Sequence, residues 1–198
     1  MLLPAQVIAE EPVHFAWAVL ADMPAETRTL DFTVPLSLPE GTTLQIYIEQ
    51  QSGSYIYLYL LSSSGQLYFL FPEQTDYYSA HPPMEKKFWI PAKSDHFELV
   101  PPGGQEKLYL MASGHRLENL EKLTEKYMEN RDDPEKKAAV LQELKKIRRQ
   151  YSTLAQTTET SVPVAGTVRT RGDQDYSFEA IKVNATDFYS KVLRINHD

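Results

Sequence analysis

The chain has 198 residues, of which 42% are hydrophobic, and a formal net charge of −7 at pH 7. This length suits one domain, or one domain with a sizeable insertion, and the apolar content excludes a disordered chain. The negative charge argues against general affinity for nucleic acid, and the lack of cysteine excludes disulfides, a thiolate nucleophile and cysteine-ligated zinc.

The N-terminal segment reads MLLPAQVIAEE, in which Val7, Ile8 and Ala9 have the small-residue character of a secretory cleavage site. No basic segment precedes them and the apolar run is short, so two interpretations stay open: the stump of a signal peptide, or an extended tail. No run of eighteen apolar residues occurs, and the sequence therefore predicts no membrane span.

Apolar residues at alternating positions, bounded by turn residues, predict strands in the first half of the chain. The predicted strands cover residues 13–20, 29–36, 44–48, 55–61 and 67–71. A proline-containing loop is expected over residues 72–87. Short strands follow in KFWIPA, HFELV and KLYLMAS.

The stretch YIYLYLLSSSGQLYFLF has the strongest pattern in the chain. Tyrosines fall on one face of the first strand and aliphatic residues on the other, because strand side chains alternate. Gly65 suits the hairpin loop, where positive φ is needed. We expect one face of this hairpin to form the centre of the core, through Ile56, Leu58, Leu60, Leu67, Phe69 and Phe71.

Residues 116–155 change to a helical period, with Leu120 and Tyr127 on one apolar stripe and Val140 and Leu144 on a second. Asp133 is the expected N-cap of the second helix. The pattern predicts an antiparallel hairpin of two helices.

Further strands are predicted at residues 162–170, 176–183 and 188–195. Since strands lie on both sides of the helices, we interpret residues 116–155 as an insertion into one domain spanning 1–198, with two separate domains as the less favoured alternative. The expected fold is mainly β: an antiparallel β-sandwich with an inserted two-helix antiparallel hairpin.

The sequence contains no G-x-S-x-G elbow, P-loop, G-x-G-x-x-G or H-E-x-x-H motif. We therefore expect no catalytic, cofactor-binding or metal-binding residues and no cofactor. The tripeptide at residues 171–173, RGD, matches an adhesion motif but is interpreted as a charged turn.

The tyrosine face suggests a binding surface. Aligned rings offer a large rigid area with a polar tip, and can contact a protein or stack on a glycan. The expected partner-binding residues are Tyr55, Tyr57 and Tyr59, with Tyr77 and Tyr78 from the loop over residues 73–87. The alternative is that helices or a second sheet cover this face and each hydroxyl finds a partner at its edge.

The middle of the chain carries several short pieces in a fixed order: Gly41 before an apolar strand, then GSYIYLYLLSSSGQLYFLFPE, FWIPA and HFELVPPGGQEKLYLMAS. Over about residues 41–113, these pieces resemble a bacterial family known as domain of unknown function 4384. The sequence departs from the family pattern at Glu73, where asparagine is usual. The helical segment and the last three strands lie outside the pattern.

This resemblance implies a small β-sandwich-like domain of the kind found in exported or envelope proteins, with no established catalytic residues. On physical grounds, we expect the Glu106 carboxylate to accept backbone N–H bonds from the Pro-Gly loop, which is a structural role. The residues that look like turn and edge determinants are Gly65, Pro72, Pro91, Gly103 and Glu106.

Two functions are therefore expected as alternatives. The first is a non-catalytic binding or scaffolding module of a bacterial envelope or extracytoplasmic protein, with a protein or glycan as partner; a cytoplasmic location stays open. The second is a hydrolase whose site is assembled from scattered residues, among them His81, Asp95, His96 and Glu98.

Overall fold

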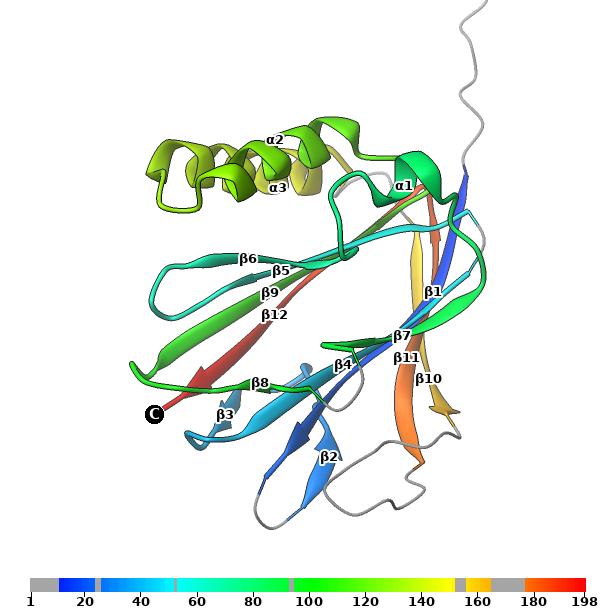
Figure 1. Cartoon of the computed structure of the whole chain (residues 1–198). Helices are drawn as coiled ribbons and strands as arrows, with labels where there is room; N and C mark the ends of the chain where they lie inside the picture. The colour runs from blue at the N-terminus through cyan, green and yellow to red at the C-terminus, as the bar shows by residue number, and fades with distance from the viewer. Residues whose placement is uncertain (1–10, 24–25, 52, 93–94, 152–155, 165–176) are drawn as a thin grey trace, which may run out of the picture.

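The structure is a computed structural model that describes residues 11–23, 26–51, 53–92, 95–151, 156–164 and 177–198. Nearly half of these residues lie in the strands of two β-sheets, and two longer helices lie over one of the sheets (Figure 1). The prediction of a mainly β chain is confirmed. The N-terminal residues 7–9 and the RGD tripeptide lie outside the described residues.

The first sheet has the strand order β10-β11-β1-β4-β7, with β2 beside β1 and β8 beside β4. Its strands pair antiparallel. Their bounds are β10 (Thr157–Val164), β11 (Phe178–Thr186), β1 (Pro12–Asp22), β4 (Thr43–Gln50), β7 (Lys86–Ile90), β2 (Thr27–Thr29) and β8 (Phe97–Glu98).

The second sheet has the order β3-β12-β9-β5-β6. Its pairs are antiparallel except β12 with β3, which is parallel. The bounds are β3 (Leu36–Leu38), β12 (Phe188–His197), β9 (Gly104–Ser113), β5 (Tyr55–Leu61) and β6 (Leu67–Phe71). The strongest hairpin of the sequence, β5 with β6, therefore lies at one edge of this sheet.

The prediction of one strand over residues 29–36 is wrong. The chain instead leaves β2 at Thr29 and turns before it enters β3. Asp31 Oδ1 accepts hydrogen bonds from the backbone N–H of Thr33 at 2.8 Å and from its hydroxyl at 2.7 Å. An aspartate that bonds the backbone two residues on makes a turn and ends a strand. These bonds also lower the pKa of Asp31.

The three C-terminal strands also differ from their predicted bounds, although β12 begins at Phe188 as predicted and only extends two residues further, to His197. The strand predicted over 162–170 begins earlier, at Thr157, and is described only to Val164. The strand predicted over 176–183 is β11, which extends to Thr186. The loop expected over residues 72–87 contains one short helix, α1 (Tyr77–Ala80).

The two longer helices are α2 (Glu118–Glu129) and α3 (Pro134–Tyr151). Asp133 caps α3 as predicted, because its Oδ1 accepts N–H bonds from Glu135 at 2.9 Å and Lys136 at 3.2 Å. The apolar residues of both helices share one buried cluster with residues of β5, β6, β9 and β12. The helices therefore cover the outer face of the second sheet, as Figure 1 shows.

A second buried cluster joins the inner faces of the two sheets. Ile56 and Leu58 lie in it, as the alternation in the sequence predicts, and Leu60 packs against it. Leu67 and Phe69 do not, because they pack under the helices. The register between β5 and β6 shifts at Leu58 and Tyr59. A shift of one residue reverses which face a strand side chain occupies, and this explains why Phe71 returns to the inner face.

Candidate functional site

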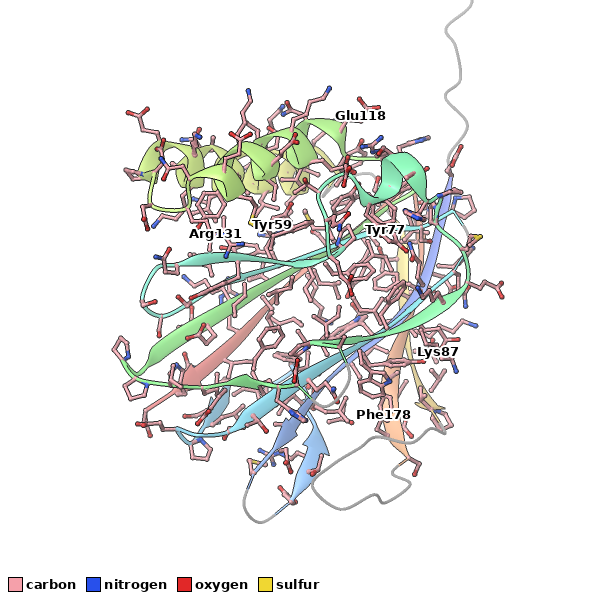
Figure 2. All side chains as sticks on the ribbon, viewed as in Figure 1. Tyr59, Tyr77, Lys87, Glu118, Arg131 and Phe178 are labelled. Atoms are coloured by element: carbon pink, nitrogen blue, oxygen red, sulfur yellow. The ribbon has the colours of Figure 1, made fainter. Side chains whose placement is uncertain are left out.

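The structure buries most of the tyrosine face. Tyr57 and Tyr59 are 0% and 1% exposed, and Tyr78 is 5% exposed. Figure 2 shows Tyr59 beneath the two longer helices and Tyr77 at the start of α1. The interpretation of Tyr57, Tyr59 and Tyr78 as a contact surface is corrected by this burial, since rings covered by other parts of the chain cannot meet a partner.

Hydrogen bonds fasten α2 to these rings. The Tyr57 hydroxyl donates to Glu121 Oε1 at 2.7 Å and accepts the backbone N–H of Leu117 at 3.0 Å. The Tyr59 and Thr124 hydroxyls lie 2.9 Å apart. Burial raises the pKa values of Tyr57 and Tyr59 above the usual tyrosine range. The tyrosine face is therefore the interface between the second sheet and α2. We call this interface, formed by Tyr57, Tyr59, Leu117, Glu121 and Thr124, the tyrosine seam.

An ion pair completes this seam. Glu121 is 5% exposed and lies 2.6 Å from Arg116 Nη2, while Arg116 Nε donates to it at 2.7 Å. The hydrogen bond to Glu121 raises the pKa of the Arg116 guanidinium further. The carboxylate is thus satisfied by Arg116 and Tyr57 together, which is what a buried charge requires.

The loop between β6 and β7 is held by Tyr78. Its hydroxyl donates to the Ile56 carbonyl and accepts the Ile56 N–H, both at 3.0 Å, and accepts Gln50 Nε2 at 3.2 Å. Tyr55 and Tyr77 are partly exposed, with rings 5.1 and 5.2 Å from Tyr78. Two of the five expected contact tyrosines thus stay accessible, at this end of the sheet.

A cleft of about 350 Å³ opens between the two sheets, at the end that carries the β5–β6 hairpin loop. Leu44, Ile46, Leu108 and Ile195 line it and belong to the inter-sheet core. Tyr68 and Val100, which are 42% and 54% exposed, also line it. This volume and apolar lining are typical of sites that accept a small ligand or a few side chains.

Two loops beside the cleft are tied together. Glu106, 7% exposed, accepts the Ser63 N–H through Oε1 at 3.0 Å, and the Ser63 hydroxyl donates to the Pro102 carbonyl at 2.9 Å. The structural role expected for Glu106 is therefore present, but the N–H comes from the hairpin loop and not from the Pro-Gly loop. A Cβ on Gly104 would lie 3.0 Å from the Ser63 Cβ, at a φ of +149°, so this close approach requires glycine.

A second bond of Glu106 reaches the last strand. His197 Nε2 lies 3.2 Å from Glu106 Oε1, and the His197 side chain is fully buried. Within the described part of the chain, His197 Nδ1 has no hydrogen-bond partner. Both recorded bonds of Glu106 are thus made by one oxygen, while the residue also lines the cleft.

The residues proposed for a hydrolytic site are only partly brought together. His96 and Glu98 line the cleft beside Ser62, Ser63 and Ser64. His81 instead stacks on Tyr77 with ring centroids 4.9 Å apart, and Asp95 is exposed outside the lining. Within the described residues, no group of three or more histidine, aspartate or glutamate side chains could hold a metal ion.

A larger cavity of about 560 Å³ lies between residues 29–33 and strands β10 and β11 of the first sheet. Its charged groups bond one another. Lys191 Nζ lies 2.7 Å from Glu159 Oε2 and 5.5 Å from the centre of the Trp17 ring, and Ser161 donates to Glu179. Trp17 Nε1, by contrast, is buried without a hydrogen-bond partner among the described residues. Since the carboxylates of Glu159 and Glu179 already have partners, we rank this cavity below the apolar cleft, whose rim carries exposed apolar side chains.

The described residues form a β-rich fold with an apolar cleft between its two sheets. Residues 37–116 match the model of a family described as Domain of unknown function (DUF4384), which confirms the resemblance seen in the sequence. Comparison with curated proteins and with solved structures finds no match. The matched segment supplies every described lining residue of the cleft except Ile195. Among the described helices, none is long and apolar enough to cross a membrane.

The sequence did not single out Tyr68 and Val100 as functional. Each stands next to a turn segment, SSSGQ and PPGG, in an apolar run. An apolar residue close to a turn was thus the signal in the sequence for both residues. It was missed because both turns were interpreted only as links between strands.

Proposed function

We propose that this chain is a non-catalytic binding module whose contact surface is the cleft between its sheets. In this proposal, residues 1–198 form one antiparallel β-sandwich and residues 116–155 an inserted helical hairpin that covers the tyrosine face. The hairpin stabilises the second sheet from its outer face and leaves the cleft between the sheets open for binding.

The exposed apolar rim of the cleft is the observation that carries this proposal. Four large hydrophobic side chains are exposed among the described residues: Val34, Tyr68, Met84 and Val100. Two of them, Tyr68 and Val100, meet at the cleft. Exposed apolar side chains that continue into a cavity favour ligand or partner contact over chance exposure.

The partner in this proposal is a protein or a glycan, in an extracytoplasmic or envelope setting such as the resemblance implies. Nucleic acid is disfavoured by the net charge of −7. Tyr55 and Tyr77 extend the available aromatic surface at the other end of the sheet, but they do not line the cleft.

A hydrolase is the second candidate, because His96, Glu98 and the three serines of the hairpin loop share one cleft. A nucleophilic serine needs a base within hydrogen-bond reach. The Ser62 hydroxyl instead lies 2.8 Å from the Ser64 hydroxyl and accepts the Gln66 N–H, and the Ser63 hydroxyl donates to the Pro102 carbonyl. Ester or amide hydrolysis that disappears in the His96→Ala variant would favour this candidate.

Site-specific photo-cross-linking tests the binding proposal. A benzophenone amino acid in place of Val100 is expected to give one discrete product with an envelope fraction of the native organism, identified by mass spectrometry. The same group in place of Val34 is the matched control, because Val34 is 56% exposed and does not line the cleft. Equal products from both positions, or none from Val100, would contradict the proposal.

A further inference from the structure

The free edge of β6 adjoins the cleft and differs from the other sheet edges. Edge strands usually carry charges or proline, or are very short, which discourages pairing with other chains. β10 contains Glu159 and Pro163, β7 begins with two lysines, and β3 has three residues. β6 reads LYFLF, without a charge or proline, and among the described strands it pairs only with β5.

Alternate side chains of β6 face the cleft side of the sheet. Tyr68 lines the cleft and Leu70 packs against the inter-sheet core, whereas Leu67 and Phe69 point to the helices. The Tyr127 hydroxyl bonds the Leu67 carbonyl at 2.9 Å, so the start of this edge is already occupied. A strand that paired with the free edge of β6 after Leu67 would place every second side chain over the cleft. This follows because paired residues on neighbouring strands point to the same face of the sheet.

The charged side chains that line the cleft are acidic. Among the described residues, its lining includes the carboxylates of Glu98 and Glu106 and the imidazole of His96, but no lysine or arginine. Glu98 is exposed, and Glu106 is buried at the hairpin loop. An occupant that carries a basic group therefore gains electrostatic complementarity, and one that carries an acidic group is disfavoured.

We infer that β6 and the cleft together accept an extended peptide of a partner protein, with alternating apolar residues and a lysine or arginine that faces Glu98. This inference rests on the proposed function and names its partner class. Backbone hydrogen bonds to the β6 edge supply affinity, while the apolar cleft and the carboxylates select the side chains. A glycan fits less well, because most of the lining consists of aliphatic and proline side chains.

Nuclear magnetic resonance titration of the full, ¹⁵N-labelled chain tests this inference with three synthetic peptides. The first has alternating valine and threonine with a lysine at each end. The second has glutamates in place of the lysines, and the third is the first peptide with alternate backbone amides methylated. We expect the lysine peptide to shift the amides of residues 68–71 and 97–100 and to bind at least about tenfold more tightly than the other two.

Two lysine substitutions provide a matched pair. Tyr68→Lys places a positive charge at the β6 edge and should weaken binding of the lysine peptide by at least about tenfold, whereas Val34→Lys should leave it unchanged. Thermal unfolding of both variants confirms that each is folded.

Equal binding of all three peptides, no binding of the lysine peptide, or shifts confined to other strands would each overturn the inference. If a partner still cross-links at Val100 in those cases, the proposed function stands and only the peptide class is wrong. If neither experiment gives a signal at the cleft, both proposals are wrong.

Discussion

Above pH 10, the free energy of unfolding should fall by at least about 5 kcal/mol for each pH unit. Burial raises the pKa values of Tyr57, Tyr59, Tyr78 and Tyr189 well above the ordinary value near 10. All four are at most 5% exposed. In the unfolded chain these hydroxyls ionise near pH 10, whereas in the folded protein they keep their protons.

The sign follows from proton binding. Above pH 10 the unfolded state binds fewer protons than the folded state, so stability is fully present below pH 10 and declines as pH rises. Each tyrosine contributes about 1.4 kcal/mol per pH unit. Since a domain of this size has about 5–15 kcal/mol of stability in total, unfolding is expected within roughly one to three pH units above 10.

Urea unfolding at pH 9, 10 and 11, with tyrosinate absorbance at 295 nm, measures this decline. Tyr59→Phe should reduce the pH slope by about 1.4 kcal/mol per pH unit, because one buried hydroxyl is removed. Tyr68→Phe is the matched control, since Tyr68 is 42% exposed, and it should leave the slope unchanged. A urea midpoint that stays constant from pH 9 to 11 would rule out the buried arrangement of these rings.

Arg116→Met is expected to lower the free energy of unfolding by about 2–4 kcal/mol. The substitution leaves Glu121 as a buried carboxylate whose remaining recorded partner is the Tyr57 hydroxyl. Breaking a buried ion pair on one side is costly because the other charge stays desolvated. The lower part of the range applies if water reaches Glu121, since the Arg116 side chain is 29% exposed.

The double variant Arg116→Met with Glu121→Gln separates charge from packing. Glutamine is neutral and keeps an oxygen for Tyr57, so the double variant should regain most of the lost stability, and a double-mutant cycle gives the coupling. Lys122→Met is the control, because Lys122 and Glu118 form a solvent-exposed pair, and no measurable change is expected. Equal losses from Arg116→Met and Lys122→Met would show that Glu121 is not buried as described.

The sequence predicted the faces of β5 correctly, because alternation in YIYLYLL is a local property. It could not predict what covers the tyrosines, since that depends on Glu121 and Thr124, more than sixty residues along the chain. The faces of Leu67 and Phe69 were predicted wrongly, because the hairpin pairs Leu67 with Leu61 and Phe69 with Tyr59, and this register has no signature in composition. Only Phe71 lies on the predicted inner face, because the register shifts at Leu58 and Tyr59.

The cleft was even less accessible to sequence reasoning. SSSG and PPGG each predicted a turn, and both are turns, but their proximity is created by the long-range bonds between Ser63, Pro102 and Glu106. Glu106 was correctly predicted to be a structural residue whose carboxylate accepts a backbone N–H. The predicted donor was the Pro-Gly loop, whereas the actual donor is Ser63 in the β5–β6 hairpin loop. The cleft could therefore be proposed as the binding site only from the structure, in which the two loops lie side by side.

The central claim is that a partner contacts the cleft and not the tyrosine seam. Hydrogen–deuterium exchange of the chain, alone and with the partner identified by cross-linking, tests this claim most directly. We predict slower exchange on binding in residues 66–71 and 96–102, with no change in α2 and α3. Slower exchange in α2 and α3, with residues 66–71 and 96–102 unaffected, would contradict it.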